Sequence, residues 1–377
     1  MEFLNQNRGV RYHSAELWRR TFGASMNPNA LLNTLNVEQP IIQGPMGGGP
    51  STAELVAAVS NAGGLGSLGA AYLSPGQILE AIQRIRALTS KPFNINLFAG
   101  GYSDAVRVDT APMLALMTQV HQELGLAPPA LPPLAKFPFT EQFEAVLEAR
   151  PPIFSFTFGI PSRDAMRRLK SLGIIILGTA TTPEEARLLE QAGVDAVVVQ
   201  GSEAGAHRGT FAGSFEAAMI PTLELVRQSV AAVSVPVIAA GGLMDGRDVA
   251  AALAAGAAAA QLGTAFLTTT ESGASELHKR TLLATTKDTT VITRAFSGRP
   301  ARGLANAFTE LLVAQPGTIL PFPLQNDLTK AMRAAAAKRG DARYVGLWAG
   351  QGVARVRALP AAELVKVLVE EMAVAAH

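Results

Sequence analysis

A histidine in a glycine-rich loop is the residue of this sequence best placed to do chemistry. His207 lies within Gly201–Phe211, directly after the apolar run Ala196–Gln200, which has the composition of a buried strand. Small residues around it let the imidazole reach a ligand. Because imidazole titrates near neutral pH, it suits a general base. We therefore predict that His207 is catalytic.

The other four histidines lie in less favourable contexts. His13 and His377 are close to the two ends of the sequence, and His121 and His278 fall in helical segments. Glu203 could orient His207 or could equally be solvated. The acids and histidines show none of the spacings typical of metal sites, so the sequence predicts no metal.

The elements that must position His207 follow an alternating pattern. Short apolar runs alternate with amphipathic helical segments, as in βα units on a parallel sheet. The eight expected strands are Pro40–Gly44, Gly64–Leu68, Phe93–Phe98, Ile153–Phe158, Gly173–Leu177, Ala196–Gln200, Pro236–Ala240 and Ala258–Gly263. Eight such strands predict an α/β fold, a (β/α)8 TIM barrel, with function at the carboxyl ends of the strands.

Three regions fall outside this alternation. Residues 100–150 are expected to form an insertion after the third strand, within a barrel domain spanning 26–270. Residues 271–377, with helical runs at Ser275–Ala284, Thr329–Arg339 and Ala361–Ala376, are expected to form a helical C-terminal segment packed on or over the barrel. Residues 1–25 carry four arginines and no apolar period, and are expected to be a leader foreign to the natural chain or a disordered extension.

Several strand ends offer amides and glycines to a ligand. After the first strand, Gln43–Met46 would let a flat ligand approach the backbone closely. In the third strand Asn94 and Asn96 face the same side, and two inward amides are costly unless they bind something. Gln200 ends the sixth strand. Phe158, near the end of the fourth, could wall a substrate pocket.

The seventh and eighth strands end in a second pattern. Gly241 and Gly242 follow the seventh, and Gln261–Thr264 closes the eighth. Glycines at these two positions mark the usual phosphate site of a TIM barrel. Bare N–H groups at a helix N-terminus and the Thr264 hydroxyl would bind the anion.

Composition narrows the function classes. The chain has 377 residues, 48% of them apolar, and a net charge of +2, so nothing calls for a nucleic-acid partner. It has no apolar run long enough for a membrane helix. The absence of cysteine excludes disulfides, thiolate metal sites and cysteine nucleophiles. A cytoplasmic location is the default expectation.

Together these motifs resemble the nitronate monooxygenase family, formerly called 2-nitropropane dioxygenases, from Pro40 to about Phe308. Each motif alone is unspecific, but their order and spacing are specific. The motifs that carry the resemblance are Pro40–Met46, Asn94–Phe98, Gly201–Gly209, Ala239–Gly242 and Gln261–Phe266. The resemblance implies an FMN enzyme that uses O2 to convert a small nitronate or nitroalkane into a carbonyl compound and nitrite.

The resemblance also implies the site residues. His207 would be the base or would bind the substrate anion. The FMN contacts would be Gln43, Gly44, Pro45, Met46, Asn96, Gln200, Gly205, Gly241, Gly242, Gln261, Leu262, Gly263 and Thr264. The sequence departs from the family at Ala206, where a second glycine is common. Candidates for the entrance are Tyr102, Pro323, Gln325 and Lys330.

Related flavin barrels give the alternatives: an enoyl-thioester reductase or an NADH:quinone reductase, both of which need NAD(P)H. The segment Arg208–Phe211 resembles the monooxygenases more closely. A non-catalytic flavin- or phosphate-binding barrel is a further alternative. The sequence leaves the physiological nitro compound open. The apolar final helix could pack internally or between two copies, which leaves a homodimer open.

Overall fold

The computed structural model describes residues 28–100, 108–132 and 139–375. The expected leader at 1–25 and the entrance candidate Tyr102 lie outside these ranges.

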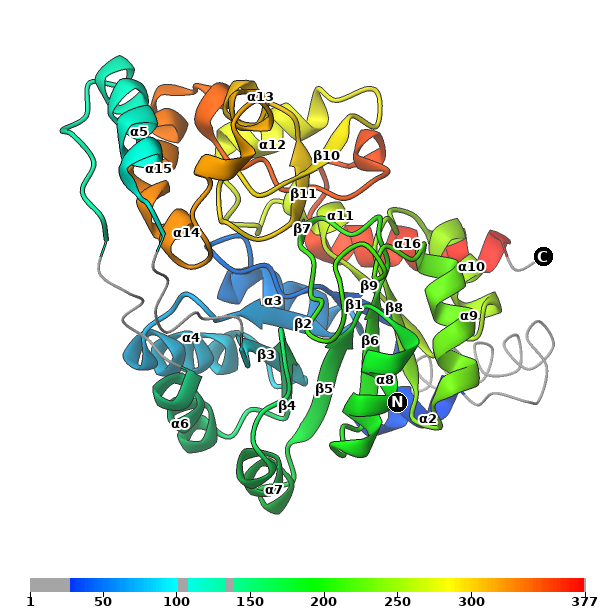
Figure 1. The fold of residues 1–377 in the computed structure, drawn as a ribbon. Coiled ribbons are helices and arrows are strands. Elements are labelled where there is room, and N and C mark those ends of the chain that lie inside the picture. Colours follow the sequence, from blue (N-terminus) through cyan, green and yellow to red (C-terminus); the bar gives the residue numbers. More distant parts are fainter. Residues whose placement is uncertain (1–27, 101–107, 133–138, 376–377) are drawn as a thin grey trace.

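A closed parallel barrel forms the body of the molecule (Figure 1). Its strands follow the order β1-β9-β8-β6-β5-β4-β3-β2, and an isolated parallel bridge between Ile42 and Leu65 joins the two ends. The strands are β1 (Ile41–Gln43), β2 (Gly66–Gly69), β3 (Phe93–Phe98), β4 (Ile153–Thr157), β5 (Ile175–Ala180), β6 (Ala196–Gln200), β8 (Val237–Ala240) and β9 (Ala259–Leu262). The predicted (β/α)8 TIM barrel is confirmed.

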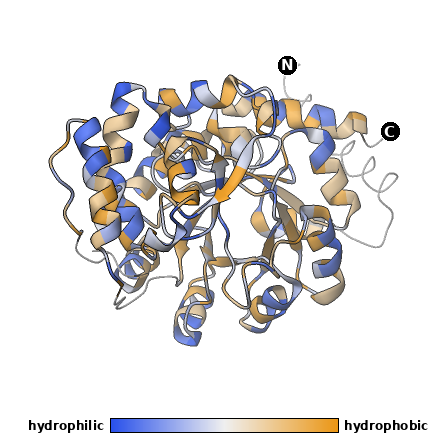
Figure 2. Cartoon of the chain, turned by 45° about the horizontal axis from the view of Figure 1, so that its top comes forward, coloured by the Kyte–Doolittle hydropathy of each residue, from blue (hydrophilic) through white to orange (hydrophobic). Residues whose placement is uncertain are grey.

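Eight helices surround the barrel: α3 (Ala53–Asn61), α4 (Pro75–Leu88), α6 (Phe139–Ala149), α7 (Arg163–Ser171), α8 (Pro183–Gln191), α9 (Thr222–Ala232), α10 (Gly246–Ala254) and α16 (Ala361–Ala375). Polar N-caps begin several of them, because the side chains of Thr52, Ser74 and Thr182 accept a hydrogen bond from the first helical turn. Figure 2 shows hydrophobic central strands and mixed faces on the surrounding helices. Each helix therefore buries one face and exposes the other.

The last helix, α16, completes this ring. It packs between α10 and α3 and buries Leu364, Val365 and Leu368. α16 thus takes the place of the eighth helix of the barrel, although it lies about a hundred residues beyond β9 in the sequence. A long insertion separates the two. At the end of the barrel where the strands begin, Leu31 and Leu35 of α2 (Pro28–Leu35) pack in one cluster with apolar side chains of the strands.

The insertion between β9 and α16 folds above the carboxyl ends of the strands (Figure 1). Its elements are α12 (Glu276–Leu283), β10 (Thr290–Thr293), β11 (Ala301–Leu304), α13 (Ala307–Val313), η1 (Pro316–Thr318), α14 (Leu324–Leu328), α15 (Lys330–Arg339), η2 (Ala342–Tyr344) and η3 (Val353–Arg355), after the short α11 (Thr264–Leu267). From the region between β3 and β4, α5 (Ala111–Glu123) joins the same core through Met113 and Met117. We call residues 268–360 together with α5 the cap.

The cap contains two strands that the sequence analysis did not anticipate. β10 pairs with β11, and β11 pairs with the two-residue strand β7 (Ala206–His207), all antiparallel. His207 lies opposite Ala301 in this pairing. The loop that carries His207 is therefore fixed by the cap as well as by the barrel.

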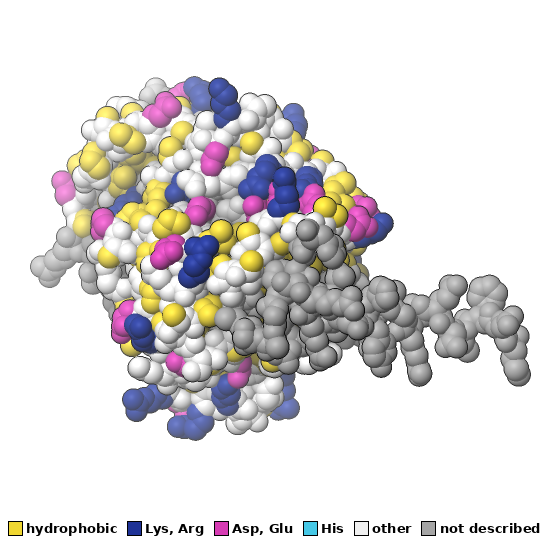
Figure 3. Space-filling view, turned by 90° about the vertical axis from the view of Figure 1, so that its right-hand side faces the viewer, with side chains coloured by type: hydrophobic (Ala, Val, Ile, Leu, Met, Phe, Trp, Pro, Cys, Tyr) yellow, Lys and Arg dark blue, Asp and Glu magenta, His cyan; other side chains and the backbone are white. Residues whose placement is uncertain are grey.

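The outer surface carries a mixture of charges. On the face seen in Figure 3, basic and acidic side chains are interspersed where the atoms are coloured. Within the described ranges, no helix combines the length and the apolar character that a membrane crossing requires.

Candidate active site

A cavity of about 570 Å³ lies between the strand ends and the cap. Most of the residues predicted for the site line it: Gly44, Pro45, Met46, Asn96, Gln200, Gly205, His207, Gly241, Gly242, Gln261, Gly263 and Thr264. Sequence positions from 44 to 264 thus converge on one space, as expected for the carboxyl end of a barrel. Phe158, expected as a pocket wall, also lines it.

Two predicted contacts do not line the cavity. The Gln43 side chain is fully buried, where its Nε2 donates to Ser51 Oγ at 3.1 Å and its Oε1 accepts from Ser67 N at 2.9 Å. The Leu262 side chain belongs to the main hydrophobic core. Their side chains therefore face away from the cavity, each next to a lining residue, Gly44 or Gly263, and their predicted contacts with the cofactor stay a prediction.

Aromatic rings surround the His207 imidazole. The ring centroids of Phe158, Phe322, Trp348 and Phe98 lie 5.9, 5.9, 6.0 and 6.4 Å from its centroid. Its Nε2 is buried and has no hydrogen-bond partner among the described residues. Because buried polar atoms are normally paired, this nitrogen is a candidate for chemistry with a ligand.

The surroundings keep this imidazole uncharged. Burial, and then the positive charges of Arg299 and Arg333, lower the pKa of His207 to about 3. Both causes disfavour the protonated ring. The His207 imidazole is therefore neutral from weakly acidic to alkaline pH.

This charge arrangement predicts a pH effect. Arg299 lies over the Phe158 ring, with its Cζ 3.9 Å from the centroid. Replacing it with glutamine removes a positive neighbour, so the pKa of His207 rises. In a pH profile of kcat/KM for a reaction in which His207 accepts a proton, the acidic limb of Arg299→Gln should lie at higher pH than in the wild type. The exposed Arg227→Gln is the control, and an unshifted limb in Arg299→Gln would contradict this assignment.

Buried charges hold the His207 loop in place. Arg208 donates from Nη1 to the carbonyls of Gly201, at 2.6 Å, and Gln200, and from Nη2 to the carbonyl of Ala218. Gln200 Nε2 donates to the His207 carbonyl at 3.0 Å, and Gln200 Oε1 accepts from Gly209 N at 2.8 Å. The side-chain amide of Gln200 thus makes its hydrogen bonds within the His207 loop. These bonds fix the position of Gln200 on the cavity wall.

Two carboxylates act on the same region. The fully buried Glu185 accepts hydrogen bonds from the N–H groups of Phe211 and Ala212 at 2.5 and 2.7 Å. Glu203 accepts from the N–H and hydroxyl of Thr222, at the start of α9. Glu203 makes no hydrogen bond with His207, so it does not orient the imidazole; it is partly exposed and caps the start of α9.

Ala206 occupies a strained backbone conformation. Its φ of 60° lies in the left-handed region, which costs an L-residue about 1–2 kcal/mol, whereas the entropic cost of a glycine is about 0.5–1 kcal/mol. We expect Ala206→Gly to raise the free energy of unfolding by up to about 1 kcal/mol, measured by urea denaturation. A clear loss of stability would show that the methyl group contributes packing that outweighs the strain.

The glycines after β8 and β9 form a cradle for an anion. The N–H groups of Gly241, Gly242 and Gly263 have no acceptor among the described residues. A Cβ added to Gly263 would meet no atom within 4 Å, so its backbone faces open space. Unpaired amides facing a cavity are a donor set for phosphate.

Two helices begin beside this cradle: α11, whose N-cap is Gly263, and α10, whose first turn is already capped. In the first turn of α10, Asp248 N donates to the N-cap residue Asp245, and Gly246 N donates to Glu371 at 2.8 Å. These N–H groups are occupied by carboxylates of the protein itself. The cradle therefore depends on the glycine amides and not on α10.

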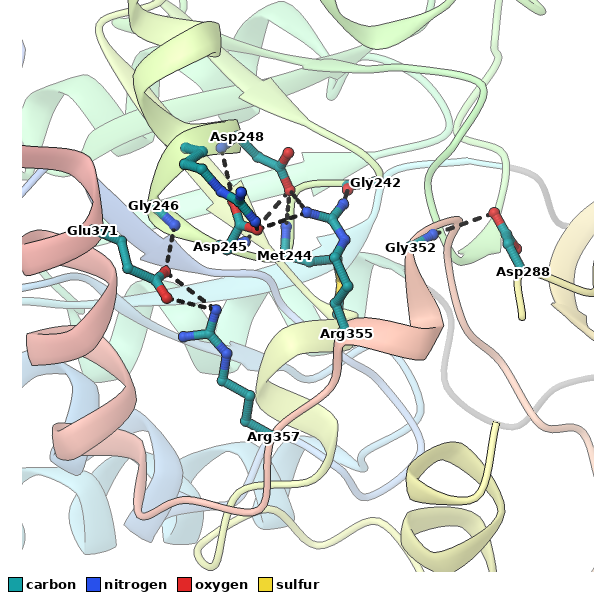
Figure 4. Close-up of polar contacts among 11 residues, drawn as sticks. Gly242, Met244, Asp245, Gly246, Asp248, Asp288, Gly352, Arg355, Arg357 and Glu371 are labelled. Atoms are coloured by element: carbon teal, nitrogen blue, oxygen red, sulfur yellow. Dashed lines mark hydrogen bonds and ion pairs between the residues drawn. The ribbon is translucent and has the colours of Figure 1, made fainter. Parts of the chain in front are cut away.

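Two arginines near the C-terminal end of the cap bind carboxylates at the β8–α10 turn and on α16 (Figure 4). Arg355 pairs with Asp245 at 2.9 Å and with Asp248 at 2.8 Å. Arg357 pairs with Glu371 of α16 at 2.8 Å. The network joins the β8–α10 turn to the segment that leads from the cap into α16, so the cradle and the cap are held as one unit.

Sequence reasoning missed Tyr72, in the loop after β2, and several lining residues that belong to the cap, including His278, Asn326, Arg333 and Trp348. Burial lowers the pKa of His278 to about 4, and its Nε2 lies 3.1 Å from the Trp348 carbonyl. Of the entrance candidates, Lys330 lines the cavity. Gln325 is buried and donates to the Ala295 carbonyl at 2.6 Å, and Pro323 is absent from the lining.

The described residues contain no group of histidines and carboxylates that could hold a metal ion. The donor set fits a flavin nucleotide instead. Glycine amides suit a phosphate, and the wide, largely apolar space beneath the aromatic rings suits a flat ring system.

Comparison with known proteins agrees with this site. Residues 29–371 match the model of the family described as nitronate monooxygenase. A probable nitronate monooxygenase of Staphylococcus haemolyticus is 41% identical over 91% of this chain and 97% of its own. One from Staphylococcus aureus is 41% identical over 92% and 98%.

Solved structures show the same relationship. A nitroalkane oxidase from Streptomyces ansochromogenes has a TM-score of 0.86 and 43% identity, over 92% of this chain and 98% of its own. FabK from Thermotoga maritima is less similar, with a TM-score of 0.71 and 29% identity over 91% and 95%. Family membership implies a flavin as the cofactor. The chain belongs to the nitronate monooxygenase family and is an oxidoreductase.

Proposed function

We propose that this protein is an FMN-dependent nitronate monooxygenase that uses O2 to convert alkyl nitronates or nitroalkanes into a carbonyl compound and nitrite. The observation that carries the proposal is a neutral, buried His207 whose Nε2 lacks a partner, on the same cavity as the unpaired glycine amides of the cradle. Family membership supports the reaction class. The cavity provides a base for the substrate and backbone amides for the cofactor phosphate.

In this proposal, Gly241, Gly242, Gly263 and Thr264 hold the FMN phosphate. Gly44, Pro45, Met46, Asn96, Gln200, Gly205 and Gln261 line the remaining length of the cofactor. The bound flavin would supply the redox chemistry between substrate and dioxygen, while the protein orients both and excludes water.

His207 would act on the substrate carbon. A neutral nitroalkane carries an acidic C–H beside the nitro group, and Nε2 takes that proton, leaving the nitronate and an imidazolium. The aromatic rings packed around His207 keep its imidazole in an apolar part of the cavity, where water competes little for Nε2. If the nitronate is supplied already ionised, proton removal is unnecessary and the base role of His207 is not used.

The test is product formation by the FMN-loaded protein. A supplied alkyl nitronate should give nitrite and the matching aldehyde or ketone in equal amounts, with uptake of O2 and without any nicotinamide. The more distant similarity to FabK makes NADH the necessary control. Oxidation of NADH together with absence of nitrite would replace this proposal with a reductase.

A further inference from the structure

Helix α15 brings positive charge to the cavity. Lys330 and Arg333, one turn apart on this helix, both line it, while the described lining contains no aspartate or glutamate. Asp327 pairs with Lys330 at 2.6 Å. No described carboxylate lies within ion-pair distance of Arg333, whose charge is therefore balanced only from further away.

The guanidinium of Arg333 is held by neutral groups. Its Nη2 donates to the carbonyl of Asn326 at 2.8 Å and to Oδ1 of the same residue at 3.1 Å. Its Nε donates to the Thr329 carbonyl at 3.4 Å. The two N–H donors of Nη1 have no acceptor among the described residues.

A partly buried cation without an anionic partner is unfavourable unless a ligand supplies the charge. Burial lowers the pKa of Arg333, although an arginine remains protonated at any physiological pH. The phosphate is already provided for by the glycine amides at β8 and β9, on the barrel side of the cavity. Arg333 approaches from the cap, so it faces a different part of the bound molecules.

We propose that Arg333 is a specificity-determining residue that binds an anionic oxygen group of the substrate through Nη1, so that charged substrates are preferred to neutral nitroalkanes. The inference rests on the proposed function. An anionic oxygen pair can come from the nitronate group or from a carboxylate elsewhere in the substrate. Arginine suits both, because its donors lie in one plane and its charge is permanent.

The test uses FMN-loaded wild type, Arg333→Gln and Arg333→Lys at pH 8. Three substrates of equal chain length are compared: butyl-1-nitronate, the nitronate of 4-nitrobutanoate, and neutral 1-nitrobutane. Lys338→Gln is the matched control, since it removes one positive charge from an exposed position of the same helix. Flavin content and thermal unfolding are measured for each variant.

Arg333→Gln should raise KM for charged substrates by roughly 10- to 100-fold, with a smaller effect on kcat, as expected for a lost charge-assisted hydrogen bond. Arg333→Lys should recover part of the loss. If the loss covers both nitronates, Arg333 binds the nitronate group; if it is confined to the nitronate of 4-nitrobutanoate, Arg333 binds the carboxylate. An equal loss for 1-nitrobutane, or loss of FMN, would overturn the inference.

A second measurement needs no variant. Butanoate should compete with butyl-1-nitronate in the wild type, and neutral butanamide should not. Equal inhibition by both would count against an anion site even if Arg333→Gln fails to fold. Failure of the proposed function is distinguishable, because the wild type would then form no nitrite from any of the three substrates.

Discussion

Replacing His207 with asparagine is expected to lower kcat/KM for a neutral nitroalkane by about 10²–10⁴-fold, the usual contribution of a general base. Asparagine keeps a polar side chain of similar length but cannot accept the substrate proton. Turnover of a supplied nitronate should fall much less, because that substrate has already lost its proton. FMN should remain bound, since the cradle lies at β8 and β9.

His278→Asn is the matched control for this experiment. His278 lines the same cavity, but its Nε2 lies at hydrogen-bond distance from the Trp348 carbonyl. We expect this variant to lose less than about tenfold, below the usual contribution of a general base. If His278→Asn were the inactive variant and His207→Asn retained full activity, the base would have been assigned to the wrong histidine.

The second large effect is expected at Gly263. A valine there keeps an allowed backbone, because φ is −103°, and its side chain would fill the open space in front of the cradle. We expect FMN binding to weaken at least about 100-fold, because two charge-assisted hydrogen bonds of about 1.5–3 kcal/mol each are lost. Flavin fluorescence titration of the apoprotein measures this directly.

Gly76→Val provides the comparison. Gly76 is exposed in the first turn of α4, and a Cβ there would also meet no atom within 4 Å. Gly76→Val therefore introduces the same side chain without a clash at a site away from the cavity. If Gly263→Val bound FMN as tightly as Gly76→Val, the cradle would have to lie elsewhere.

The sequence predicted those parts of the site that carry a local signal. At these strand ends an apolar run is followed by glycine or amide residues, and this pattern can be recognised in the sequence. For this reason the prediction that Asn96, Gln200, Gly242 and Thr264 lie on one cavity was correct. Strand limits were less exact. β5 begins at Ile175 and not at Gly173, because Gly173 has a φ of 69° and ends the preceding turn.

The contribution of the cap could not be predicted in this way. Trp348 and Arg333 lie more than a hundred residues beyond His207, and only tertiary packing brings them to it. β7 has two residues, too few for a periodic pattern, so its pairing with β11 left no trace in the sequence. The buried position of the Gln43 side chain could not be predicted either, because a strand-end amide has the same sequence signal whether it faces the cavity or the core.

The most direct test of the central claim is anaerobic mixing of the FMN-loaded protein with an alkyl nitronate, and separately with NADH, while the flavin absorbance is followed. Reduction of the flavin by the nitronate, with nitrite appearing once air is admitted, is the predicted result. Reduction by NADH with no response to the nitronate would contradict the account and identify the protein as a reductase built on the same barrel.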